Sequence, residues 1–347
     1  METIFYLLIT VLVIGFLTFI HEFGHFFFAR LFKVPVLEFA IGMGPKIYSW
    51  TGKQGTKYAL RAFPIGGFVQ MEGEEGTSEN PMAYNNLNPW KKIVVTAAGP
   101  IVNIVFAIIV MFALVICSPN LGSTTIGVFE DDAISNQKLM EWDEIVQVGD
   151  VKVHTGEELV YEIMMQGYEA IDIVVIRNGE RLVIEDVVFN TVEEQGAVLA
   201  VVDFRLFALS VLDDVTFFDY LYQAFYRSIN MVKMVYDSLW GMITGRFGMD
   251  AMSGPIGIVE TVGQVAKVSI GSLVNLIVMI SMNLGIFNLL PIPALDGGRI
   301  LFVLIELITG RPVPKEREGL IHFIGFAVLI LLMIFVTIND VIRIFTM

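Results

Sequence analysis

Two histidines and a glutamate lie within one short run, His21-Glu22-Phe23-Gly24-His25. Residues four apart on a helix lie one turn above each other on the same face, so His21 and His25 can bind one metal ion together. Glu22 then stands beside the metal and can act as a base toward a water molecule there. The spacing predicts metal-assisted peptide hydrolysis, with Zn²⁺ as the expected cofactor.

The same run follows a long apolar segment. Residues 4–20 are uncharged and mostly apolar, as in a helix that spans a membrane. Ionisable side chains near the centre of such a helix cost roughly 2.5–3.5 kcal/mol each on insertion scales, so a cluster of three indicates a functional site. A bound metal ion would account for that cost.

A catalytic zinc usually has three protein ligands, and Asp296 is the candidate for the third. It follows the uncharged run 268–295, at the end of which Pro291 and Pro293 break the helix. Non-helical backbone at membrane depth is tolerated only where it is buried in protein or lines a wet cavity, so we expect Asp296 to face the metal. The alternative is an ordinary cap of the following helix. His154 and His322 each stand alone and are predicted to be structural.

Composition places the chain in a membrane. Hydrophobic residues make up 55% and charged residues 17%, against about 25% charged in soluble domains. The net charge of −14 is concentrated in residues 122–214, which hold 20 acidic and 5 basic side chains. This stretch is predicted to be a water-facing acidic domain, and its charge argues against nucleic acid or anionic lipid as its ligand.

Four apolar stretches are long enough to cross a bilayer, which needs about 20 residues. Lys and Arg crowd the first and third connections, so these should be cytoplasmic, with both chain ends and the acidic domain outside. The metal site should then lie nearer the cytoplasmic side. The expected segments are a first span with HEFGH (1–32), a cytoplasmic or re-entrant β-loop region (33–91), a second span (92–117), an extracytoplasmic β domain (120–205), an amphipathic helical linker (206–266), a third span with NLLPIPALDGG (267–310) and a fourth span (317–346).

Between the first two spans, residues 36–71 combine Gly-Pro turns with β-favouring residues and predict short strands. Such strands beside a membrane site can offer an open edge to an extended peptide, although a simple cytoplasmic cap is the alternative. Residues 72–86 are polar and predict a mobile loop. The apolar stripe over 218–242 predicts an amphipathic helix that docks on the protein or lies on the outer membrane face.

The acidic domain has its own β pattern. An Asn178-Gly179 turn joins two apolar runs, which predicts a hairpin. The run 142–151 resembles the central strand and turn of a PDZ domain, with Trp142 where a glycine is usual. Any small β-sandwich would show a similar pattern, so that reading stays open beside the PDZ-like one.

The HEFGH run, the NLLPIPALDGG run, Gly99-Pro100-Ile101-Val102-Asn103 and the PDZ-like insert together resemble the bacterial site-2 proteases, intramembrane zinc metalloproteases of the RseP/RasP type. The resemblance implies a polytopic α-helical membrane protein, with about four transmembrane helices, a membrane-associated β-rich loop and an inserted PDZ-like β domain. It implies zinc ligation by His21, His25 and Asp296, and Glu22 as the general base. It further implies substrate contacts by Asn288 and by Gly66, Gly67 and Phe68 of the β-loop.

The function implied by the resemblance is cleavage of transmembrane segments of single-span membrane proteins in the bacterial cytoplasmic membrane. Anti-sigma factors after a first cut, or leftover signal peptides, are the substrate classes it suggests, with lipid bilayer but no nucleic acid as a further partner. Two other readings remain: a catalytically silent scaffold that binds peptide tails through the PDZ-like domain, and a membrane metal carrier. The intact HExxH and Asp296 argue against the first, and the single closed cluster of ligands argues against the second.

Overall fold

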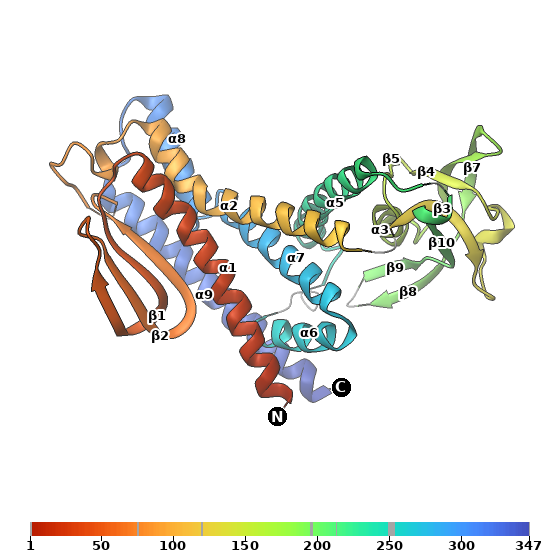
Figure 1. The fold of residues 1–347 in the computed structure, drawn as a ribbon, viewed down its shortest axis with the longest axis horizontal. Coiled ribbons are helices and arrows are strands. Elements are labelled where there is room, and N and C mark those ends of the chain that lie inside the picture. The colour runs from red at the N-terminus through yellow and green to blue at the C-terminus, as the bar shows by residue number, and fades with distance from the viewer. Residues whose placement is uncertain are drawn as a thin grey trace. The chain divides into compact units, whose positions relative to one another are not determined.

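The computed structural model describes residues 2–74, 76–118, 121–194, 197–212, 214–248 and 254–346. The chain folds into two compact units. Unit 1 comprises Met1–Ala107 and Ser253–Met347, and unit 2 comprises Ile108–Met252. Both are drawn in Figure 1, where colour follows the chain from red to blue.

Unit 1 is built mainly from helices. They are α1 (Glu2–Leu31), the first part of α2 (Pro89–Ile116), α6 (Pro255–Val268), α7 (Ile270–Leu289), α8 (Asp296–Thr309) and α9 (Lys315–Thr346). Among the described residues, four helices are long and apolar enough to cross a membrane: Phe5–Leu31, Pro89–Ile116, Ile270–Leu289 and Lys315–Ile342. The prediction of four spans is therefore confirmed.

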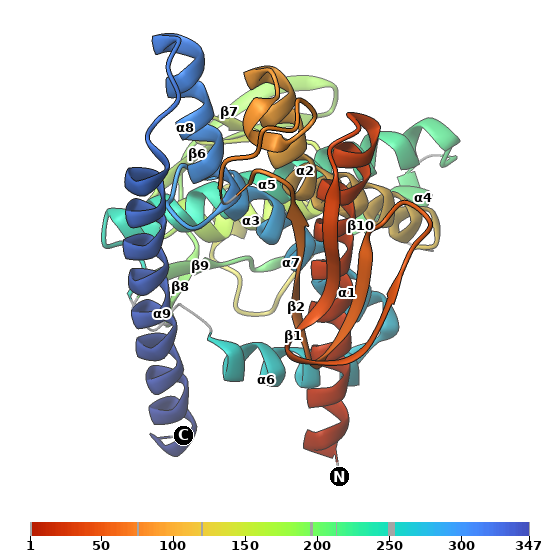
Figure 2. The same ribbon diagram turned by 90° about the vertical axis from the view of Figure 1, so that its left-hand side faces the viewer.

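The outward side chains of α9 fit a lipid environment. Val328 is 57% exposed and Leu331 66% exposed, and contiguous apolar surface of this kind is unusual in water. Helix α1 begins and α9 ends at the same end of unit 1 in both ribbon views (Figures 1 and 2). An even number of membrane crossings requires that arrangement.

The third apolar stretch forms a shorter helix than its length suggests. Ser269 has extended backbone (φ −167°), separates α6 from α7 and caps α7 by accepting a hydrogen bond from the Ser272 backbone N–H. Helix α7 ends at Leu289, and α8 begins at Asp296. Residues 290–295, which contain the two prolines, are non-helical as the sequence predicts.

A bent pair of strands, β1 (Val36–Thr51) and β2 (Lys57–Met71), packs beside α1 (Figure 1). The strands are longer than the short ones predicted, because Gly42, Gly44 and Gly66 adopt positive φ of 79–84° and bend the chain without ending the pairing. Residues 38–41 are paired along both edges, with 67–70 on one side and 57–60 on the other. The stretch 67–71 is therefore an outer strand of this sheet.

The segment predicted as a mobile loop, 72–86, makes side-chain hydrogen bonds. Glu72 accepts hydrogen bonds from Ser78 Oγ at 2.6 Å and from Asn80 Nδ2 at 2.9 Å. A 3-10 turn, Tyr84–Asn86, follows, and the Tyr84 hydroxyl lies 2.7 Å from Thr96 Oγ1 of α2. These bonds connect the segment to the helix that follows it.

Unit 2 contains the β structure expected of the acidic domain. Its elements are β3 (Gly122–Phe129), a 3-10 turn (Ser135–Gln137), β4 (Glu144–Val148), β5 (Val151–Lys152), α3 (Gly156–Gln166), β6 (Ile171–Arg177), β7 (Glu180–Val187), β8 (Asn190–Glu194), β9 (Ala197–Val201), β10 (Phe204–Ala208), α4 (Leu209–Leu212) and α5 (Phe217–Ile243). The sheet order is β10-β3-β4-β6-β7, with β5 on β4 and a separate β8-β9 hairpin. Its core includes Ile126, Ile145, Leu159 and Ile173.

Two turns in unit 2 follow from local sequence. Asn178 and Gly179 have φ of 54° and 83° and form the predicted two-residue turn between β6 and β7. Trp142 has φ of 72°, a conformation that favours glycine. Its ring lies 4.4 Å from the ring of Phe207, centroid to centroid.

Helix α5 docks on α3 through polar contacts. Lys233 Nζ lies 2.5 Å from Glu162 Oε1, and the Tyr161 hydroxyl donates to Asp237 at 3.0 Å. Phe218, in the first turn of α5, is exposed. Contact with the protein, one of the two predicted alternatives, is thus present along this helix.

Candidate metal centre

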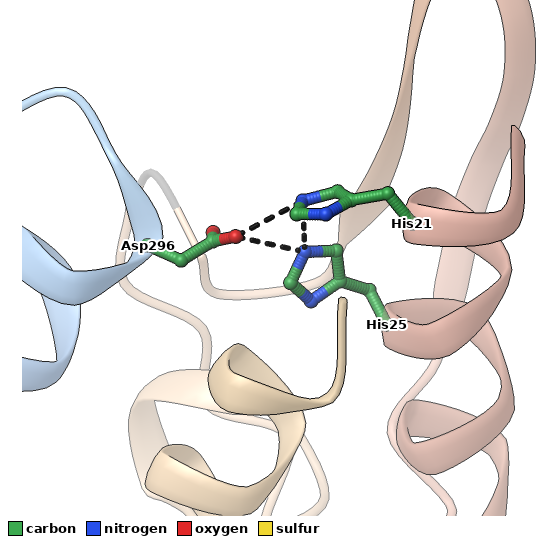
Figure 3. A group of neighbouring side chains, drawn as sticks. All are labelled: His21, His25 and Asp296. Atoms are coloured by element: carbon green, nitrogen blue, oxygen red, sulfur yellow. Dashed lines mark hydrogen bonds and ion pairs between the residues drawn. The ribbon is translucent and has the colours of Figure 1, made fainter. Parts of the chain in front are cut away.

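The two histidines of α1 and the aspartate that begins α8 converge on one point (Figure 3). His21 Nε2 lies 3.2 Å from His25 Nε2. Asp296 Oδ2 lies 3.0 Å from His21 Nε2 and 3.3 Å from His25 Nε2. Both histidines are buried. The three residues predicted from the sequence are therefore brought together by the fold.

These three residues fit a zinc ion. Zinc bonds of about 2.0–2.2 Å in tetrahedral geometry separate neighbouring ligand atoms by roughly 3.3 Å, and the observed separations are 3.0, 3.2 and 3.3 Å. Asp296 Oδ2 is buried, yet within the described part of the chain it has no hydrogen bond of normal geometry. This is the arrangement expected of a metal site, because the lone pairs of the oxygen and of the two ring nitrogens would all point at the same cation.

Helix α2 supports the histidines with one residue per turn: Val95, Gly99 and Asn103. His25 Nδ1 lies 3.0 Å from the Val95 carbonyl oxygen. A carbonyl can only accept, so Nδ1 carries the proton and Nε2 presents its lone pair to the metal position. A Cβ on Gly99 would overlap the His25 ring, so the glycine is needed for this close packing.

The backbone before Asp296 is held in an unusual conformation. Ala294 has φ of 75°, and its N–H donates to His322 Nδ1 of α9 at 2.8 Å. A Cβ on Gly297 or on Gly298 would overlap carbonyl groups of residues 289–292, which explains the two glycines after the aspartate. His322, predicted to be structural, thus holds the segment that presents a candidate metal ligand.

The metal position opens into a cleft of about 800 Å³. Glu22 lines it together with the three candidate ligands, and so do Asn288, Gly67 and Phe68. The amide of Asn288 donates to the Leu284 carbonyl oxygen at 2.8 Å. Gly66 is not among the lining residues that the structure describes; its positive φ bends β2 beside them. A Cβ on Gly67 would lie 3.2 Å from Glu22 Cγ and 2.8 Å from the Ala40 carbonyl oxygen, so this glycine leaves room for the glutamate.

Comparison with known proteins matches residues 9–332 to the model of peptidase family M50. The chain belongs to this family. A Clostridium acetobutylicum protein, provisionally named a zinc metalloprotease, is 36% identical over 97% of this chain and 98% of its own length. The zinc metalloprotease RasP of Oceanobacillus iheyensis and the regulator of sigma-W protease RasP of Bacillus subtilis are each 29% identical, over 96% of this chain and 98% of theirs.

As an M50 peptidase of the site-2 protease type, the protein is a zinc metalloprotease. The predicted family, enzyme class and zinc cofactor are confirmed. The four apolar helices and the bacterial relatives make it a bacterial membrane protein.

Sequence reasoning did not identify an ion pair that lines the M50 cleft. Arg299, one turn after Asp296 on α8, pairs with Glu74, and Lys315 Nζ donates to the Glu74 carbonyl oxygen at 3.3 Å. These contacts tie the segment before α2 to α8 and α9. Arg299 stands three residues after the predicted ligand, and that spacing on one helix face was the available signal.

Proposed function

We propose that this M50 peptidase cleaves transmembrane segments of single-span membrane proteins within the cytoplasmic membrane of its bacterium. The observation that carries the proposal is the composition of one cleft. Candidate zinc ligands, a glutamate and the outer strand 67–71 all line it. Protein chains in the bilayer, not nucleic acid, are the partners that such a site fits.

In the proposed reaction His21, His25 and Asp296 hold zinc. When bound, zinc supplies Lewis-acid polarisation of the scissile carbonyl and a water activated for attack. Glu22 accepts the proton of the attacking water and delivers it to the leaving amine. Asn288 holds the backbone of the substrate in the cleft.

A helical substrate must unwind before its peptide bonds can be attacked. Lipid cannot replace the backbone hydrogen bonds that are lost, so a strand edge beside the metal must supply them. In the described residues, 67–71 pairs with β1 along one edge only, and all five of its residues line the cleft. Strand addition at this edge, aided by the bend at Gly66 and the bare backbone at Gly67, is the proposed mode of binding around Phe68.

The substrates we propose are membrane-anchored anti-sigma factors shortened by a first protease, with leftover signal peptides as a further class. The name of the Bacillus subtilis relative, a regulator of sigma-W, supports the first. The segment boundaries predicted from the sequence are part of the proposal. The proposal also includes the reading of 120–205 as a single PDZ-like domain outside the membrane that excludes proteins with bulky outer parts. The sheet order and the conformation of Trp142 support the PDZ-like fold. The basic residues of 33–91 support the proposal that the metal lies nearer the cytoplasm.

The test is co-expression with a tagged single-span substrate already trimmed on its outer side, scored by gel shift. We expect wild type and the matched control Glu169→Gln, at an exposed position of unit 2, to cut it. Glu22→Gln and zinc-chelated wild type should leave it intact. A cut that persists in Glu22→Gln would reject the assigned base. Binding of the substrate by wild type without any cut would favour the silent scaffold, and zinc transport without proteolysis would favour the metal carrier.

A further inference from the structure

Asn103 of α2 contacts the other side of a candidate ligand. Its side chain has no exposed surface, and its amide Nδ2 lies 3.4 Å from His21 Nδ1. Within the described residues the amide oxygen, Oδ1, has no hydrogen-bond donor. The backbone carbonyl of Asn103 accepts a hydrogen bond from the Ser281 hydroxyl at 2.9 Å, so the residue also joins α2 to α7.

The direction of this amide decides where the His21 proton sits. If Nδ2 donates to His21 Nδ1, the ring proton must be on Nε2, the nitrogen that faces Asp296 Oδ2. A protonated Nε2 cannot bind a metal. The amide nitrogen and oxygen of asparagine are nearly equal in size, so a half-turn of the amide fits the same space. It brings Oδ1 to His21 Nδ1, which then carries the proton and leaves the Nε2 lone pair free.

We propose that Asn103 is a positioning residue for the metal centre, with its amide oxygen accepting the Nδ1–H of His21. The proposal rests on the metal centre described above. Val95 serves His25 in the same way two turns earlier on α2, through a backbone carbonyl. Helix α2 therefore fixes the tautomer of both histidines, one by main chain and one by side chain.

The test measures zinc affinity of the purified full-length protein in detergent, by competition with a chromogenic chelator, together with thermal unfolding of the metal-free form. Asn103→Leu keeps the branched shape of the side chain and removes the acceptor, and we expect zinc to bind about 10–100-fold more weakly. Asn103→Asp keeps the acceptor, so we expect affinity equal to or above wild type, because a carboxylate accepts more strongly from the ring N–H. If Asn103→Leu does not fold, Asn103→Ala takes its place with the same expectation.

A merely structural Asn103 would give the opposite order. A buried carboxylate without a donor is costly, so Asn103→Asp would then bind zinc worst and Asn103→Leu would match wild type; that order overturns the proposal. Ser281→Ala is the matched control, because it removes only the contact to the Asn103 backbone and should leave affinity unchanged. If wild type itself bound no zinc, the metal centre would fail and not the role of Asn103 alone.

Discussion

Replacing Gly99 by alanine should damage the metal centre although all three candidate ligands stay in the sequence. The added Cβ would overlap Nε2 of the His25 ring most closely, and would lie 2.7 Å from Cε1 and 2.8 Å from Cδ2, against ordinary contact at 3.4–4 Å. The ring must therefore retreat by roughly 0.6 Å or more to relieve the overlap. That shift exceeds the tolerance of about 0.2 Å for a metal–ligand bond. It also moves His25 Nδ1 away from the Val95 carbonyl oxygen, from which it is 3.0 Å distant in the wild-type structure.

We expect Gly99→Ala to lower zinc affinity by about 100-fold, the upper end of effects seen when support of a ligand is lost, which corresponds to about 2.7 kcal/mol. Chelator competition on the purified protein measures it, and proteolysis of a model substrate should fall in parallel. Gly319→Ala on α9 is the matched control, because a Cβ there meets nothing within 4 Å. Wild-type zinc affinity in Gly99→Ala would refute the argument that this glycine sets the position of His25.

Three further predictions concern the cleft and its supports. Gly67→Val should keep zinc but abolish cleavage, because its side chain fills the space beside Glu22 and the strand edge; zinc content and gel shift measure the two effects. His322→Leu should weaken zinc binding several-fold, because the Ala294 N–H loses its acceptor, while His322→Gln should restore part of the loss. In the wild-type protein the buried ammonium of Lys92 lies 2.9 Å from both carboxylate oxygens of Glu306. Lys92→Met should destabilise the protein by about 3–5 kcal/mol, because the Glu306 carboxylate loses this partner; denaturant unfolding measures the loss.

Each of these has an outcome that would contradict it. Normal cleavage by Gly67→Val would show that the strand edge is not used by the substrate. Equal zinc affinities for His322→Leu, His322→Gln and wild type would show that the Ala294 segment holds its conformation without His322. For Lys92, pairing Lys92→Met with Glu306→Met should recover much of the lost stability, and a fully additive loss would indicate that the two side chains do not stabilise each other.

The candidate metal ligands could be predicted from the sequence because ionisable side chains are unexpected in an apolar span. His21 and His25 share a helix face by spacing alone, and ionisable groups in an apolar span require an explanation. Asp296 could be found because two prolines end the apolar run before it. The turn at Asn178-Gly179 was predictable for a similar reason, since a two-residue turn with positive φ selects these residues locally.

Supporting residues were not accessible in this way, because their roles arise from contacts between distant segments. Nothing local shows that Gly99 packs against a histidine ring, or that His322 accepts from Ala294. The lengths of β1 and β2 were also missed. Residues 36–71 were predicted to form short strands and turns, whereas positive φ at Gly42 and Gly44 bends strands that continue to pair. Tertiary pairing, not local propensity, decided the outcome there.

X-ray absorption at the zinc edge can show whether His21, His25 and Asp296 bind zinc, on the same preparation that is assayed for cleavage. We expect one zinc per chain, with two imidazole nitrogens and at least one oxygen at about 2.0–2.2 Å. In a His25→Ala variant one imidazole contribution and the cleavage should disappear together. Zinc bound through the sulfur of Cys117, or cleavage by a preparation without zinc, would contradict the account.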